Sequence, residues 1–352
     1  MLDRRAWLRV ERRCLHREVL VVTGAAAMAP VSNVVVMFME NHTFDNLASD
    51  VAGVDGDLSL ALAPDRPHDA PHNHQAWMRR ATGAVRQRYS RAQVPFIVSL
   101  MDRYTVCDRY YSDVSTNSFP NHAFAIGADA EGAITNPTTG TKPFLNYPGV
   151  PVRLAAHGHR WANYGHGFAF RYYTDAAMRT NTHPAAQVVT DAHNGQLPDV
   201  CWVYGPGGQD FHPGSSSMRA SDSWLQTTIQ GIASGKRADG QPLWDHLALF
   251  VTFDDWGGWT DHVPPPVLET TSTGDPYRYG SRVPCVVVSP FAKARHVSHD
   301  TSSHTSLVAY IERLYNLAPS TNPAAAARTA NANEHALADC FQPAPYTPNP
   351  AP

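Results

Sequence analysis

The sequence predicts a three-layer α/β domain with a mostly parallel central sheet. Residues 33–39 and 247–253 are apolar almost throughout and rich in β-branched and large side chains, as in strands buried on both faces. Helical patterns separate the candidate strands, and this alternation favours a parallel sheet between two helical layers. The other candidate strands are residues 106–111, 160–164, 200–204 and 283–289, and the candidate helices are residues 94–104, 121–128, 224–233 and 305–317.

The composition is that of a globular protein without a strong charge bias. The chain has 352 residues, of which 43% are hydrophobic and 17% are charged, enough to bury a large core. Its 28 basic and 31 acidic side chains give a formal net charge of -3, which offers no electrostatic basis for binding nucleic acid. We expect a small molecule or a lipid headgroup as partner, and the oligomeric state stays open. No apolar run reaches the ~18–20 residues that cross a bilayer.

The cysteines lie far apart and form no CxxC pair, so neither a thiolate zinc site nor a dense disulfide framework is indicated. One or two isolated disulfides remain open. The cysteines are Cys14, Cys107, Cys201, Cys285 and Cys340.

We expect residues 1–30 to form an N-terminal extension, residues 31–318 the functional domain, and residues 319–352 a C-terminal tail. The extension contains Arg4 and Arg5 and a short apolar stretch, as a twin-arginine export signal does. Charged residues interrupt this pattern, which favours a basic helix instead. Export and a cytoplasmic location are both left open.

Three polar clusters follow predicted strands or open a predicted helix. Glu40 and Asn41 come after the first strand, Asp254 and Asp255 after residues 247–253, and Ser118 before a helix. Because ligands bind at the carboxyl ends of strands in open α/β sheets, these clusters are expected to converge. Adjacent buried carboxylates repel one another unless a cation is present. The all-oxygen donor set predicts one divalent ion, Mg²⁺, Ca²⁺ or Mn²⁺ rather than Zn²⁺.

Ser118 is the candidate nucleophile. A hydroxyl at a helix N-terminus lies beside free N–H groups and the positive end of the helix dipole, which stabilise an alkoxide and a bound phosphate. A metal on the same oxygen would lower its pKa further. The alternatives are that Ser118 only caps the helix, or that Ser115 or Thr116 takes its place.

Five segments together resemble the bacterial phosphoesterase family, which contains the non-specific phospholipases C and related acid phosphatases of the alkaline phosphatase superfamily. The segment with two aspartates, two glycines and three prolines is the most specific. The segments are VVVMFMENHTFD (34–45), DAPH (69–72), SFPN (118–121), DFHP (210–213) and FDDWGGWTDHVPPP (253–266).

The resemblance implies an alkaline phosphatase-like fold and a metal-dependent phosphoester hydrolase. The implied metal ligands are Glu40, Asn41, Ser118, Asp254 and Asp255, and the implied catalytic residues are Ser118, Asn121, His72 and His212. Ser118 is then the nucleophile, the two histidines contact phosphoryl oxygens, and Asn121 lies beside the nucleophile. His68 and His74 compete with His72, and the roles of His262 and His304 stay open.

We therefore expect an acid phosphatase-like phosphomonoesterase that acts through a phosphoseryl intermediate. The alternative within the same chemistry is a phospholipase C-type phosphodiesterase that releases a phosphorylated headgroup. An alternative of another class is a protein that binds a phosphorylated ligand without turnover.

Overall fold

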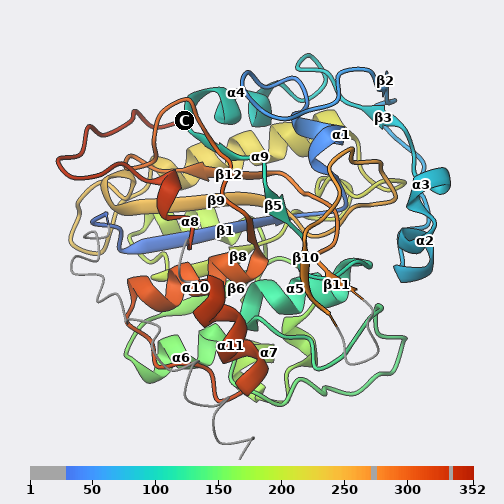
Figure 1. The fold of residues 1–352 in the computed structure, drawn as a ribbon. Coiled ribbons are helices and arrows are strands. Elements are labelled where there is room, and N and C mark those ends of the chain that lie inside the picture. Colours follow the sequence, from blue (N-terminus) through green and yellow to red (C-terminus); the bar gives the residue numbers. More distant parts are fainter. Residues whose placement is uncertain (1–28, 271–275, 333–335) are drawn as a thin grey trace, which may run out of the picture.

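An eight-stranded sheet forms the centre of the protein, with strand order β13-β4-β12-β9-β1-β8-β6-β7 (Figure 1). The structure is a computed structural model that describes residues 29–270, 276–332 and 336–352, so most of the predicted N-terminal extension lies outside the described residues. Strand β12 runs antiparallel to both of its neighbours, and the other neighbouring pairs are parallel. The predicted mostly parallel sheet is therefore confirmed. The strands are β1 (Asn33–Met39), β4 (Thr105–Cys107), β6 (Trp161–Tyr164), β7 (Thr182–His183), β8 (Val200–Val203), β9 (Leu247–Phe253), β12 (Cys285–Val288) and β13 (His296–Ser298).

Strands β1 and β9 are the central pair, and both have the bounds that their apolar runs predict. Every residue in the two strands is buried, because helices cover both faces of the sheet at this point. The pair is in parallel register from Asn33 opposite Leu247 to Met39 opposite Phe253. Both strands therefore end at the same edge of the sheet.

Helices cover the two faces of the sheet, which confirms the predicted three layers. In Figure 1, α4 and α9 lie above the sheet, and α5, α6, α10 and α11 lie below it. Helix α8 packs against α9. The helices are α1 (Phe44–Ala48), α2 (His74–Met78), α3 (Arg80–Gly83), α4 (Pro95–Arg103), α5 (Ser118–Gly127), α6 (Val150–Ala156), α7 (Ala176–Thr180), α8 (Gln187–His193), α9 (Met218–Ala233), α10 (His304–Leu314) and α11 (Pro323–Ala332).

Helix α5 begins earlier than the sequence predicts. Its first residue is Ser118 and its N-cap is Asn117, so Pro120 lies in the first turn, where a missing N–H group costs no hydrogen bond. Helix α9 also begins earlier than predicted, since the Ser217 side chain accepts a hydrogen bond from the Ala220 N–H and fixes its start.

The single strand predicted at residues 106–111 is wrong. The chain forms β4 in the main sheet, then leaves it and forms the short β5 (Tyr110–Tyr111), which pairs with β14 (Ser302–Ser303). The polar Asp108 and Arg109 separate the two strands. Two other short pairs, β2 (Ala61–Leu62) with β3 (Gln87–Arg88) and β10 (Val267–Thr270) with β11 (Pro276–Arg278), lie outside the main sheet.

The C-terminal residues pack against the domain. Helix α11 contacts α10, Ala325 is fully buried, and the Cys340 Sγ atom lies 3.5 Å from Cys107 Sγ. The last ten residues form no helix or strand, but the Tyr104 hydroxyl donates to the Pro350 carbonyl at 2.6 Å. The four cysteines in the described part of the chain form no disulfide, and all four are buried.

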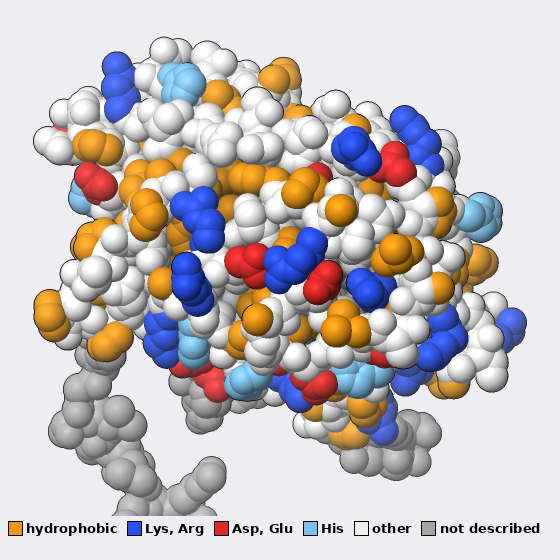
Figure 2. All heavy atoms as spheres, turned by 90° about the horizontal axis from the view of Figure 1, so that it is seen from above, with side chains coloured by type: hydrophobic (Ala, Val, Ile, Leu, Met, Phe, Trp, Pro, Cys, Tyr) orange, Lys and Arg blue, Asp and Glu red, His pale blue; other side chains and the backbone are white. Residues whose placement is uncertain are grey.

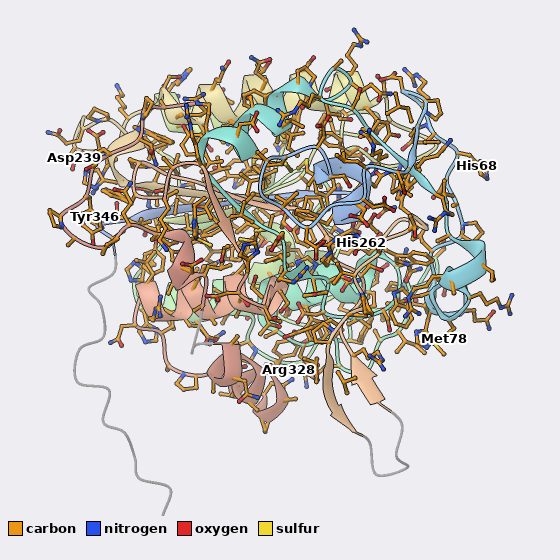
Figure 3. All side chains as sticks on the ribbon, turned by 45° about the horizontal axis from the view of Figure 1, so that its top comes forward. His68, Met78, Asp239, His262, Arg328 and Tyr346 are labelled. Carbon is orange, nitrogen blue, oxygen red and sulfur yellow. The ribbon has the colours of Figure 1, made fainter. Side chains whose placement is uncertain are left out.

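The surface carries both signs of charge. On the face that Figure 2 shows, basic and acidic side chains are intermixed, and apolar side chains lie between them. The β10–β11 hairpin projects from the body of the protein in Figure 3. No helix within the described ranges is both long enough and apolar enough to span a membrane.

Candidate active site

The two central strands bring four of the predicted metal ligands together. Glu40 and Asn41 follow the last residue of β1, and Asp254 and Asp255 follow the last residue of β9. The Asp254 N–H donates to the Met39 carbonyl at 3.0 Å, which continues the ladder past the strand ends. The predicted convergence at the carboxyl ends of these strands is thus present.

The turns after β1 and β9 pack tightly against each other. Asn41 has a φ of 62°, a left-handed conformation that asparagine tolerates better than most residues. Its N–H group donates to Asp254 Oδ1 at 2.8 Å. Gly257 has a φ of 57°, and a Cβ atom added there would lie 2.1 Å from the Asn41 carbonyl oxygen. Only glycine fits this contact, so Gly257 keeps the two ligand pairs close together.

Ser118 opens α5 directly beside these ligands. Its side-chain oxygen lies 3.4 Å from Glu40 Oε2, 3.4 Å from Asn41 Oδ1 and 3.2 Å from Asp255 Oδ2. The residue is only 4% exposed. Asn117 is the N-cap, so the Ser118 hydroxyl is directed to the acidic cluster instead of capping the helix. The hydroxyl of Thr116, a competing candidate, donates to the Ile134 carbonyl at 2.7 Å.

The donor set fits a divalent cation. Burial and the charge of Asp254 raise the pKa of Asp255 well above its ordinary value, because two buried carboxylates are side by side. In one orientation of the Asn41 amide, its oxygen lies 3.0 and 3.2 Å from the two Asp254 carboxylate oxygens. Acceptors in such contact repel one another unless a cation lies among them. In the opposite orientation the amide nitrogen donates to Asp254, so a bound cation selects the first orientation.

His72 and His212 approach the cluster from the side of Asn41. Their Nδ1 atoms lie 2.8 Å from the Ala70 carbonyl and 2.7 Å from the Pro213 carbonyl, so each Nε2 atom is directed to the site. His72 Nε2 is 3.5 Å from Asn41 Nδ2, and the two imidazole rings are 6.3 Å apart. Burial lowers the pKa of His212, but the charges of Glu40, Asp69 and Asp254 and the bond to the Pro213 carbonyl together outweigh it, and the net shift is upward.

Of the two histidines that compete with His72, neither reaches the cluster. His68 is exposed at the edge of the molecule (Figure 3). His74 Nδ1 lies 2.8 Å from the Ser115 carbonyl, so this ring holds the turn before α5.

Two further histidines that the sequence analysis did not single out lie against Glu40. His122 is fully buried, and its Nε2 atom is 3.3 Å from Glu40 Oε1 and 3.4 Å from Asp254 Oδ2. Its position four residues after Ser118 on α5 was a usable signal, because residues four apart share a helix face. His166 Nε2 lies 3.5 Å from Glu40 Oε1 and comes from the loop after β6, where the sequence carries no comparable signal.

The charges on these histidines depend on burial and on the two carboxylates. Burial alone lowers the pKa of His122, but the nearby carboxylates of Asp254 and Glu40 raise it to about 9. At His166 burial has a larger effect than the nearby Glu40 charge, and the pKa is lowered. Without a cation in the cluster, His122 would therefore be protonated at neutral pH.

Asn121 and His304 hold the backbone around the cluster. The Asn121 amide accepts from the Val114 N–H at 2.9 Å and donates to the carbonyls of Val114 and Asn117, both at 3.2 Å. The structure thus does not bring this amide to the Ser118 hydroxyl. His304 Nε2 lies 2.8 Å from the Asp254 carbonyl, and burial lowers its pKa to about 4. The neutral ring donates this hydrogen bond and fixes the Asp254 backbone.

A separate ionic network, buried at Arg282 and exposed at His262, holds the loops outside the cluster. The fully buried Arg282 contacts Asp261 at 2.8 Å and Asp45 at 3.1 Å. His262 Nδ1 lies 2.7 Å from an Asp45 oxygen, and His262 Nε2 lies 2.9 Å from Asp55 Oδ1. Partial burial lowers the pKa of His262, but the two carboxylates raise it overall. His262 therefore belongs to this network and not to the cluster around Ser118.

Comparison with known proteins gives consistent matches. The model of the family described as "Phosphoesterase family" matches residues 61–318, a range that includes Ser118 and both aspartates and begins after Glu40 and Asn41. A "Non-hemolytic phospholipase C" of Burkholderia pseudomallei is 25% identical over 85% of this chain and 58% of the relative. A "Non-specific phospholipase C3" of Arabidopsis thaliana is 23% identical over 66% of this chain and 49% of the relative. The chain thus spans between about half and 60% of the length of these relatives.

A solved structure described as a protein in the alkaline phosphatase superfamily, from Vibrio parahaemolyticus, aligns with 87% of this chain and 71% of that chain. The sequence identity is 11% and the TM-score is 0.47.

Proposed function

Because the chain belongs to the phosphoesterase family, we propose that it is a phosphoric ester hydrolase whose nucleophile is the Ser118 hydroxyl. One observation carries the proposal: this hydroxyl, at the first residue of α5, lies 3.2–3.4 Å from oxygens of Glu40, Asn41 and Asp255. A serine that only caps a helix does not require carboxylate and amide oxygens from three other residues around its hydroxyl. The helix N-terminus also favours a bound phosphate.

The proposed reaction has two displacement steps. Ser118 Oγ forms a bond to phosphorus while the bond from phosphorus to the alcohol oxygen breaks, and the alcohol leaves with a proton. Water then attacks phosphorus, the Ser118–phosphorus bond breaks, and the serine hydroxyl regains its proton as phosphate leaves. Two in-line displacements retain the configuration at phosphorus overall.

We propose that one divalent cation, Mg²⁺, Ca²⁺ or Mn²⁺ rather than Zn²⁺, belongs to this site, because the predicted ligands are all oxygen donors. When bound, the ion would lower the pKa of the Ser118 hydroxyl and stabilise negative charge on the phosphoryl group. The ligands would be Glu40, Asn41, Ser118, Asp254 and Asp255.

His72 and His212 are proposed to contact the phosphoryl oxygens. Their Nε2 atoms are directed to the site, and protonated imidazoles would donate to oxygens that gain charge in the transition state. The need for protonated donors favours an acidic optimum, and the raised pKa of His212 keeps this donor protonated to a higher pH. Asn121 acts indirectly in this scheme, by holding the turn that carries Ser118.

We propose an acid phosphatase-like phosphomonoesterase as the first candidate activity. The phospholipase C names of the relatives support the second candidate, a phosphodiesterase that releases a phosphorylated headgroup. Initial rates on a chromogenic phosphomonoester, a phosphodiester and phosphatidylcholine vesicles separate the two. A phosphatidylcholine rate well above the monoester rate would favour the second candidate.

Trapping the intermediate tests the proposed chemistry directly. After rapid acid quench with a phosphomonoester, mass spectrometry should find one phosphate on the peptide that contains Ser118. The same peptide from Ser118→Ala protein should carry none. Turnover by the wild-type protein with no phosphopeptide at any quench time would contradict a phosphoseryl intermediate. Ligand binding without turnover of any of the three substrates would instead support the non-catalytic alternative.

A further inference from the structure

His122 is a buried polar side chain beside the acidic cluster that the proposed reaction leaves unused. It lies one helical turn after Ser118 in α5 and has no exposed surface. Neither ring nitrogen has a hydrogen-bond partner among the described residues, although the Nε2 atom is directed at Glu40 and Asp254. A buried, unpartnered imidazole in an acidic cluster requires an explanation, because such groups are rarely left unsatisfied.

We propose that His122 Nε2 is a ligand of the divalent cation, so that the site is a mixed nitrogen and oxygen centre. The inference rests on the proposed function, because it adds a residue to the metal site of that function. It also narrows the identity of the ion, since an imidazole ligand favours a transition metal ion over Mg²⁺ or Ca²⁺.

The distances favour this assignment over an ion pair. The Nε2 atom lies 3.3 Å from Glu40 Oε1 and 3.4 Å from Asp254 Oδ2. A protonated imidazole donating to a carboxylate makes contacts of ~2.7–2.9 Å. Two ligands at right angles around a divalent ion, with bonds of ~2.1–2.4 Å, are separated by about 3.0–3.4 Å. The contacts between the Ser118 side-chain oxygen and its neighbours are 3.2–3.4 Å long, which lies in the same range of ligand-to-ligand distances.

Aromatic packing fixes the ring in this orientation. Tyr204 stacks on His122 at an interplanar angle of 8°, with the ring centroids 5.4 Å apart. Phe38 and Phe168 meet the ring edge-on, at 82° and 80°. A ligand held so by its surroundings loses little conformational entropy when a cation binds, which strengthens binding.

The test is pulsed electron paramagnetic resonance of the full chain loaded with Mn²⁺ alone. Protein with natural ¹⁴N histidine should show a nitrogen coupling to Mn²⁺ that changes when histidine carries ¹⁵N. The His122→Gln variant should lose this coupling, and the matched control His166→Gln should keep it. The control is informative because His166 Nε2 also lies near Glu40, at 3.5 Å.

A comparison of the Mn²⁺ and Mg²⁺ affinities gives a second measurement. A merely structural role of His122 would not alter the two affinities differently. Calorimetric titration of His122→Gln should show Mn²⁺ binding weakened at least about tenfold, with a much smaller change for Mg²⁺, which prefers oxygen ligands. Equal weakening of Mn²⁺ and Mg²⁺ binding would overturn the assignment.

The outcomes separate this inference from the proposed function. If Mn²⁺ binds and supports phosphoester hydrolysis but the wild-type spectrum contains no histidine nitrogen coupling, only the His122 assignment fails. If Mn²⁺ does not bind the wild-type protein at all, the proposed metal-dependent function fails with it. If His122→Gln does not fold, the wild-type spectrum still decides, together with His166→Gln and His212→Gln. Loss of the coupling in either of these variants would overturn the assignment to His122.

Discussion

The replacement of Ser118 by alanine is the most direct test of the site, because it removes one oxygen atom from a well-packed position. The three contacts of this oxygen are 3.2–3.4 Å long, well beyond the ~2.7–2.8 Å of strong hydroxyl hydrogen bonds. Their loss should change the free energy of unfolding by less than about 1 kcal/mol. Turnover, by contrast, should fall at least about a thousandfold, which corresponds to ~4 kcal/mol of activation free energy.

The assay is hydrolysis of a chromogenic phosphomonoester, with the melting temperature measured on the same samples. Ser115→Ala is the matched control, since Ser115 lies in the same turn and its carbonyl, which accepts from His74, is unaffected by the substitution. We expect this control to keep near-wild-type turnover. A Ser118→Ala protein that is folded and still hydrolyses the substrate at a near-wild-type rate would refute the assignment of the nucleophile.

Four further predictions concern the metal site, the turn beside it and the ionic network around Arg282. Chelation should abolish hydrolysis, and Asp254→Asn should weaken metal binding in a calorimetric titration; full activity of the metal-free protein would exclude a metal role. Gly257→Ala should reduce turnover and metal affinity together, because the added Cβ would lie 2.1 Å from a backbone oxygen; unchanged metal affinity would show that the turn can adjust. Arg282→Met should lower the free energy of unfolding by about 3–5 kcal/mol, as measured by urea denaturation, because it removes the buried cation that pairs with Asp261 and Asp45; a loss below 1 kcal/mol would contradict this. His262 stabilises the fold while it is protonated: this contribution is complete below its ordinary pKa of ~6.5 and is lost as pH rises through its raised folded-state pKa. The melting temperature of the wild-type protein should therefore fall more than that of His262→Gln across that range. Parallel profiles of melting temperature against pH would disprove the effect.

The sequence was most informative where local pattern and burial coincide. The apolar runs that form β1 and β9 predicted their bounds, since a strand buried on both faces has few polar positions to obscure its ends. The same logic placed Glu40 and Asp254 at one edge of the sheet. In contrast, the apolar character of residues 106–111 hid the break between β4 and β5, which depends on which strand each half pairs with.

The site residues that the sequence did not predict depend on tertiary contacts. His122 faces Glu40 only because α5 packs below the sheet in the observed orientation, and His166 reaches the same carboxylate from a distant loop. Asn121 shows the opposite case: the family resemblance implied a place beside the nucleophile, but its amide hydrogen-bonds to the backbone of the preceding turn. Residue type and spacing do not reveal which hydrogen bonds a side chain already makes.

Because β1 pairs in register with β9, the site contains one part whose geometry is hard to change and another part, on loops, that can vary. Glu40 and Asp254 are attached to the two central strands, which are buried throughout, so their spacing is set by backbone pairing that few substitutions can alter. His166 and the two rings opposite, His72 and His212, are carried by loops, which tolerate insertion and replacement far better. Under selection, such a protein can exchange substrates by changing its loops while the bond-breaking chemistry is inherited intact. Libraries that randomise those loops should therefore yield altered substrate preferences more often than libraries that randomise the strand ends.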